Sequence, residues 1–107
     1  MIDIQVRWKG EPFSLTARGH AEAARNEDGR DLVCCAASTI IQTLGVSCAS
    51  LMEVETVYHR ADGFARILVT GTEAHWEQLV PRFQMAIDGL TVLANQYPQH
   101  VSLSVEE

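Results

Sequence analysis

A cysteine and a histidine flank a polar, glycine-containing stretch of this 107-residue chain. His20 follows a segment of alternating polarity, and Cys34 falls in the predicted first turn of an alanine-rich helix. A histidine within hydrogen-bond reach of a thiol can serve as its base, which makes the thiol a nucleophile. The start of a helix also favours an anion and lowers the pKa of a thiol from its free value of about 8.5. Cys34 and His20 are therefore a candidate nucleophile and a candidate general base.

Two nearby polar residues could support this chemistry. Asp31 stands at the expected N-cap of the helix, and its carboxylate could also orient His20 in a triad-like set. Ser38 lies one turn after Cys34, where it either hydrogen-bonds to the site or serves as a small residue for close packing. Backbone N–H groups at the helix start could hold an oxyanion. The spacing also permits a purely structural interpretation, in which Cys34 is a buried cysteine and His20 ends a strand.

Helical phase distinguishes the two adjacent thiols. At roughly 100° per residue, Cys35 falls on the predicted buried stripe, whereas Cys34 lies about 160° from Leu32. Cys34 is therefore expected to be available for chemistry, and Cys35 and Cys48 to be small buried hydrophobes. The predicted buried stripe consists of Leu32, Cys35, Ala36, Thr39, Ile40, Thr43 and Leu44.

Metal binding is the competing use of these thiols. Adjacent cysteines point apart on a helix, and no second Cys/His pair with ligand spacing follows in the sequence. A redox role is not favoured either, because the chain has no Cys-x-x-Cys spacing. We therefore expect no metal and no cofactor.

Hydrophobic periodicity predicts the elements that position the site. A hairpin precedes a surface loop at 21–30, and the first helix closes at Gly45. Thr72 should cap the second helix, and Pro81 should kink it or mark its true first turn. The predicted fold is α+β, with two helices packed on a largely antiparallel sheet in the order ββαββαβ. The predicted elements span residues 2–8, 13–18, 32–44, 52–58, 64–70, 73–96 and 101–105.

Composition limits the partners of the chain. Its length predicts a single domain over 1–107, and its net charge of -6 with no Lys/Arg cluster argues against nucleic-acid binding. The alternating segment 1–9 is not a signal peptide, and no apolar run approaches the roughly 18 residues that span a bilayer. We therefore expect no membrane partner. Three cysteines, two of them adjacent, fit a reducing cytoplasm better than a disulfide framework.

Two motif regions resemble the ribosomal-processing cysteine protease family of bacteria. One is Gly19-His20-Ala21 followed by Asp31-Leu32-Val33-Cys34-Cys35-Ala36-Ala37-Ser38. The other is C-terminal: Gly89-Leu90, Ala94-Asn95-Gln96-Tyr97-Pro98 and Val101-Ser102-Leu103. The resemblance thus covers nearly the whole chain.

The resemblance implies a cysteine endopeptidase with Cys34 as nucleophile and His20 as general base. Gly19, Asp31 and Ser38 are the remaining motif positions. Members are cytosolic homodimers that remove an N-terminal extension from a large-subunit ribosomal protein, and the loop at 21–30 would close over this substrate. The alternative is a non-catalytic ribosome-assembly or protein-binding module of the same fold, with Cys34 as a relic or regulatory thiol.

Overall fold

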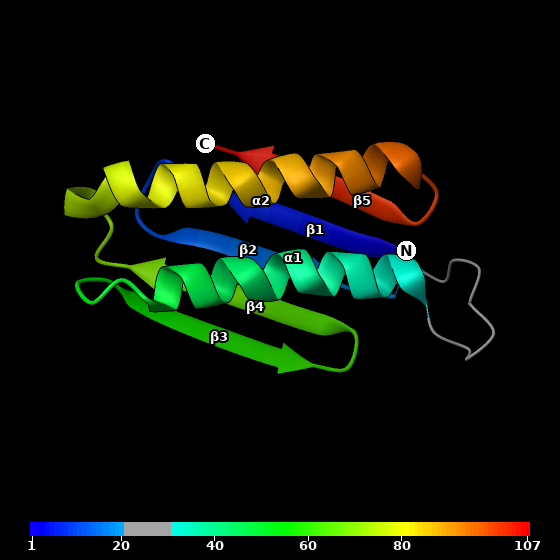
Figure 1. The fold of residues 1–107 in the computed structure, drawn as a ribbon, viewed down its shortest axis with the longest axis horizontal. Helices are drawn as coiled ribbons and strands as arrows, with labels where there is room; N and C mark the ends of the chain where they lie inside the picture. The colour runs from blue at the N-terminus through cyan, green and yellow to red at the C-terminus, as the bar shows by residue number, and fades with distance from the viewer. Residues whose placement is uncertain (21–30) are drawn as a thin grey trace.

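The computed structural model describes residues 1–20 and 31–107, so the predicted loop at 21–30 lies outside the described residues. Two helices cover one face of a five-stranded sheet (Figure 1). The α+β fold and the element order ββαββαβ are thereby confirmed. In chain order the elements are β1 (Ile2–Arg7), β2 (Phe13–Arg18), α1 (Leu32–Ala49), β3 (Glu55–Ala61), β4 (Phe64–Thr70), the 3-10 turn η1 (Glu73–His75), α2 (Trp76–Gln96) and β5 (Val101–Glu106).

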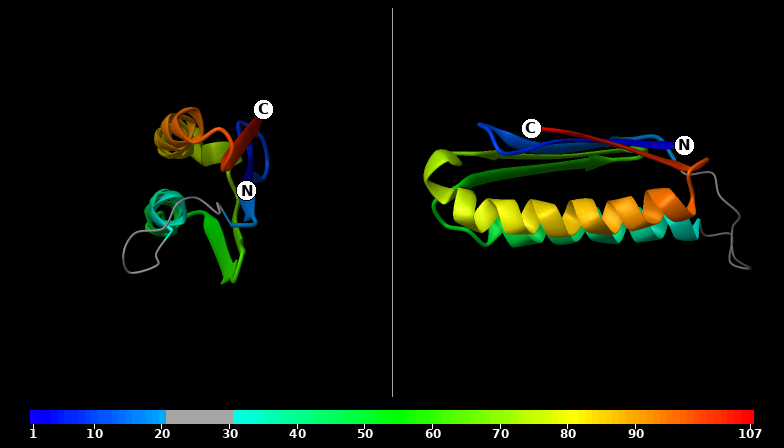
Figure 2. Two further views of the ribbon diagram at one scale, coloured as in Figure 1. Left: turned by 90° about the vertical axis from the view of Figure 1, so that its right-hand side faces the viewer. Right: turned by 90° about the horizontal axis from the view of Figure 1, so that it is seen from above.

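The sheet has the strand order β3-β4-β2-β1-β5. All neighbouring strands pair antiparallel except β1 and β5, the first and last strands of the chain, which are parallel. Both helices pack on the same face of the sheet, and no described residue forms a helix on the other face (Figure 2). Strand β3 is an edge strand beside α1, and this arrangement forms one wall of the candidate site.

The core lies between the helices and the covered face of the sheet. Phe13 packs edge-to-face against Phe83 with ring centroids 5.2 Å apart, and against Trp76 at 5.9 Å. These contacts attach the start of α2 to β2. Leu15 and Ile67, which pair across β2 and β4, are completely buried beneath the helices.

Helix α1 runs past its predicted end at Gly45 and continues to Ala49. Gly45 is not a C-cap but a buried interior residue that packs against the ring of Tyr58 on β3. A Cβ atom at position 45 would lie 2.3 Å from Cδ2 of Tyr58. Glycine is needed here because the helix approaches the edge strand closely, and this need is indistinguishable in sequence from a terminal glycine.

The face that α1 buries also differs from the predicted stripe. Leu32 is 56% exposed and Cys35 is exposed, whereas Cys34 is partly buried beside the core. The prediction for Cys35 was wrong, and that for Cys48 is confirmed. Apolar and small side chains occupy most of the circumference of this helix, so their spacing alone does not determine which side of the helix faces the sheet. The buried residues are Val33, Ala37, Ile41, Leu44, Gly45 and Cys48.

By length and composition, α1 could cross a membrane, with a mean hydropathy of 1.7 over 18 residues. This contradicts the expectation that no apolar run approaches that length. Alanine, cysteine and threonine extend the run beyond its few large apolar residues. Ala37, Ile41 and Leu44 are only 2–4% exposed and pack in the core, and 33% of the apolar window is buried inside the fold.

The start of α2 differs from its predicted form. Thr72 precedes η1 and makes no side-chain cap bond; its hydroxyl donates instead to the carboxylate of Glu11. Helix α2 begins at Trp76 and continues beyond Pro81, so the alternative that Pro81 marks its first turn is wrong. The proline removes one backbone hydrogen bond inside the helix, because it has no N–H to donate.

Candidate active site

His20 is positioned by the glycine before it. Gly19 has φ +94°, and a Cβ atom there would lie 2.3 Å from the carbonyl oxygen of Met1. Only glycine fits this combination of left-handed backbone and close approach. The N–H of Gly19 donates to the carbonyl of Gly63 over 2.8 Å. The end of β2 is thereby attached to the β3–β4 turn, and His20 lies beside that turn.

Cys34 is positioned by the cap of α1. Oδ1 of Asp31 accepts the N–H groups of Val33 and Cys34, each over 3.0 Å, and the backbone carbonyl of Asp31 accepts that of Cys35. Asp31 is only 8% exposed, and its predicted role as N-cap is confirmed. These three N–H groups donate to Asp31, so they are not open to a substrate oxyanion in this structure.

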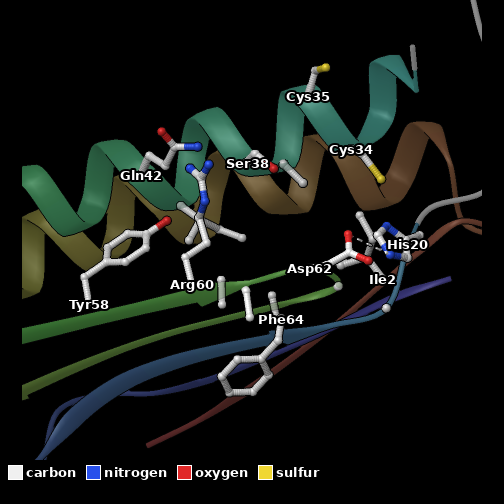
Figure 3. Close-up of a pocket in the computed structure, with 17 residues that line it drawn as sticks. Ile2, His20, Cys34, Cys35, Ser38, Gln42, Tyr58, Arg60, Asp62 and Phe64 are labelled. Carbon is white, nitrogen blue, oxygen red and sulfur yellow. Dashed lines mark ion pairs between the residues drawn. The ribbon is translucent and has the colours of Figure 1, made fainter. Parts of the chain in front are cut away.

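A cleft of about 450 Å³ lies between α1 and the sheet. Gly19, His20, Cys34 and Ser38 line it, so the structure brings four of the five predicted site residues together. Asp31 caps the helix end and is not a lining residue. The thiol of Cys34 points down toward His20, whereas that of Cys35 points away from the sheet (Figure 3). Both cysteines line the cleft, but their thiols point in opposite directions (Figure 3), and Cys35 is exposed rather than buried.

An acidic residue that the sequence did not single out lies next to His20. Oδ1 of Asp62, in the β3–β4 turn, is 3.6 Å from Nε2 of His20. A Cβ atom at Gly63 would lie 3.1 Å from the same nitrogen, so the turn backbone lies against the imidazole. The side chains of Asp62 and His20 are 98% and 53% exposed, which limits such an ion pair to about 0.2–1 kcal/mol. Arg18, at the end of β2, pairs with Phe64, at the start of β4, and this register brings the β3–β4 turn next to His20.

The cleft continues past Cys34 along α1. Gln42 on the helix and Tyr58 and Arg60 on β3 line this part. The predicted third strand ended at residue 58, three residues before its observed end, so Arg60 was not recognised as a strand residue. Alternation along β3 was the available signal, because Tyr58 and Arg60 are two residues apart and lie on one side of the strand.

The third thiol is chemically distinct. Cys48 is completely buried, and burial raises the pKa of its thiol to about 11. It is therefore protonated and unreactive in the folded protein at neutral pH. Among residues 1–20 and 31–107, no group of three or more His, Cys, Asp or Glu side chains is arranged to hold a metal ion.

Comparison with known proteins identifies the class. A family model described as cysteine protease Prp matches residues 1–102. The ribosomal processing protease Prp of S. aureus, solved with a covalently linked product peptide, superposes with a TM-score of 0.79 and 22% identity, over 99% of this chain and 100% of that one. SMU.848 of Streptococcus mutans gives a TM-score of 0.71 and 24% identity, over 99% and 94%. No curated protein sequence matches.

The protein is a cysteine peptidase. It belongs to the cysteine protease Prp family, because the family model covers nearly the whole chain. The predicted resemblance is thus confirmed. At these identities the two solved structures establish the common fold.

Proposed function

We propose that this protein is an endopeptidase that removes the N-terminal extension of a large-subunit ribosomal protein during ribosome assembly. The observation that carries the proposal is the placement of Cys34 and His20 in one cleft of a chain that belongs to a cysteine protease family. The S. aureus relative is described as a ribosomal processing protease and was solved with a substrate peptide.

In the proposed mechanism, the Cys34 thiolate attacks the carbonyl carbon of the scissile peptide bond. The carbon–nitrogen bond then breaks, and His20, as imidazolium, donates its proton to the leaving amine. This leaves a thioester on Cys34. His20 next takes a proton from water, the resulting hydroxide attacks the thioester, and the carbon–sulfur bond breaks to release the acid and restore the thiolate.

The other motif residues act by positioning. Asp31 holds the first turn of α1 and thereby the Cα position of Cys34. Gly19 permits the turn that places His20 on the opposite lip of the cleft. Ser38 lines the same wall one turn further along the helix, where its hydroxyl can contact a bound peptide. Orientation of His20 by Asp31 remains an alternative to orientation by Asp62.

We also propose that the protein is a homodimer that pairs through its helix layer. The outer side of α1 and α2 has an apolar groove of about 500 Å³, whose lining includes Ile40, Thr43 and Met85. Met85 is 76% exposed and Val92, on the same helix, is 57% exposed. Exposed apolar groups along such a groove favour a protein partner. Met85→Glu should give a monomer in analytical ultracentrifugation; a wild-type monomer at micromolar concentration would contradict the dimer.

A cytoplasmic location is part of the proposal. Cys34, Cys35 and Cys48 form no disulfide among the described residues, a state that a reducing compartment maintains. Cell fractionation with an antibody against the protein tests this directly. Its recovery with secreted or periplasmic proteins would contradict a cytoplasmic site of action.

The alternative function is binding without cleavage, in ribosome assembly or protein recognition. The test incubates the wild-type protein with the ribosomal precursor of its own organism and follows both binding and cleavage. A precursor shortened at its N-terminus, detected by intact mass spectrometry, supports the peptidase. Stable binding without any mass change would favour the binding module.

A further inference from the structure

The far part of the Cys34 cleft presents a cation to any bound peptide. Arg60 projects from edge strand β3 toward α1, where the side chains of Ser38 and Gln42 face it (Figure 3). Tyr58 lies two residues earlier on the same side of β3, and its hydroxyl points into the same space (Figure 3). Arg60 is exposed, so a ligand can reach its guanidinium from the cleft.

Arg60 makes no hydrogen bond or ion pair with any residue that the structure describes. Two arginines on other elements, Arg7 on β1 and Arg82 on α2, do have partners. Arg7 pairs with Glu106 at 3.3 Å, and the guanidinium of Arg82 donates to backbone carbonyls. Asp62, in the β3–β4 turn, lies instead at His20. Among residues 1–20 and 31–107, no acidic side chain therefore pairs with this cation in the cleft.

The groups around Arg60 suit one class of ligand. A guanidinium is planar and binds a carboxylate through two parallel hydrogen bonds. The amide of Gln42 and the hydroxyl groups of Tyr58 and Ser38 can donate further hydrogen bonds to the same oxygens. A solvated charge that protects an edge strand from pairing is the competing explanation for Arg60. That explanation does not account for its position inside the cleft rather than on the open face.

We propose that Arg60, with Gln42 and Tyr58, forms a carboxylate-binding subsite that selects an acidic residue of the peptide substrate. The proposal rests on the peptidase function proposed above. Along the axis of α1, Ser38 lies about 6 Å from Cys34, and Gln42 lies about 12 Å from Cys34. An extended peptide advances about 3.3 Å per residue. The selected residue therefore lies about two to four residues from the bond that Cys34 attacks.

The test uses synthetic peptides that span the cleaved bond of the ribosomal precursor, with Glu, Gln or Lys at each flanking position in turn. Wild-type protein should cleave the peptide with Glu at one such position about tenfold faster than the peptide with Lys, as kcat/KM. Arg60→Glu should reverse this preference, and Arg60→Gln should abolish it. If each variant changes kcat/KM by the same factor for the Glu, Gln and Lys peptides, the proposed subsite is refuted.

A matched control is Arg66→Glu, the same charge change at an exposed residue of β4 outside the cleft. This variant should keep the wild-type preference; a reversal would show that net charge, not the subsite, determines it. Peptides with a C-terminal amide distinguish an acidic side chain from a terminal carboxylate. If only free C-termini are preferred, selection of an acidic residue is refuted.

Binding of the same peptides to Cys34→Ser, followed by fluorescence anisotropy, separates this inference from the proposed function. A preference for Glu that Arg60→Glu reverses supports the subsite even where no bond is cleaved. Absence of cleavage by wild type contradicts the peptidase alone. Equal binding of the Glu and Lys peptides would contradict the subsite alone.

Discussion

Replacing Gly45 with alanine should destabilise the protein although position 45 lies inside a helix. Alanine is favoured over glycine in a helix interior by about 1 kcal/mol. A Cβ atom at this position, however, would lie 2.3 Å from Cδ2 and 2.7 Å from Cε2 of Tyr58. Either the ring must move or α1 must separate from β3, and such overpacking costs about 1–3 kcal/mol. We therefore expect a net loss of about 1 kcal/mol.

Gly89 in α2 supplies the matched control. The nearest atom to a Cβ at position 89 is Cδ1 of Ile40, at 3.3 Å, and this is the flexible end of a side chain. Gly89→Ala should therefore retain most of the helical gain and stabilise the protein by up to about 1 kcal/mol. The two variants make the same chemical change, and their effects on the free energy of unfolding should have opposite signs.

Urea unfolding of both variants measures these free energies. The decisive comparison repeats Gly45→Ala in a protein that also carries Tyr58→Ala. Without the phenol ring, Gly45→Ala should become stabilising, so the coupling between the two positions should be about 2 kcal/mol. If Gly45→Ala is as stabilising as Gly89→Ala in the wild-type background, the close contact between α1 and β3 is refuted.

Three further predictions concern single side chains. Cys48, with its pKa raised to about 11 by burial, should resist alkylation at neutral pH until the protein unfolds, whereas exposed Cys35 should react in the folded state; peptide mass spectrometry distinguishes them. Hydrogen bonds from Thr72 and Gly71 hold the pKa of Glu11 below 4.5, so its stabilising effect is present above 4.5 and is lost as pH falls through the lower folded value. Glu11→Gln should therefore lower Tm more at neutral than at acid pH. Asp62→Asn should reduce kcat/KM about two- to fivefold, the effect of an exposed ion pair, in steady-state assays.

Each of these predictions has a contrary result. Rapid alkylation of folded Cys48 would show that the thiol is accessible. A Tm difference between Glu11→Gln and wild type that is constant with pH would show that the carboxylate charge is not involved. Unchanged kcat/KM in Asp62→Asn would show that His20 does not depend on this carboxylate.

The sequence predicted the elements well wherever the local pattern was sufficient. Period-two alternation predicted β2 with its observed bounds, at 13–18, and β4 was also predicted with its observed bounds, at 64–70. It failed where tertiary contacts decide. Gly45 was predicted to be a helix end because its contact with Tyr58 is invisible in the sequence. The buried face of α1 was also wrong, because its apolar residues extend around most of the helix.

The candidate site was likewise predictable only in part. His20 and Cys34 are distinctive residue types at the ends of two predictable elements, and the structure places both in one cleft. Arg60 and Asp62 come from strand β3 and the turn after it, 40 or more residues from His20 in the chain. Their proximity depends on the register of β2 with β4 and of β4 with β3. Sequence spacing contains no information about that register.

The central claim is that Cys34, and not its neighbour Cys35, is the nucleophile. Its most direct test is cleavage of the organism's own ribosomal precursor by wild type, Cys34→Ser and Cys35→Ser. The two variants make the same one-atom change at adjacent residues whose thiols point in opposite directions (Figure 3). We predict that cleavage is lost with Cys34→Ser and retained with Cys35→Ser. Retention of cleavage by Cys34→Ser would contradict the account.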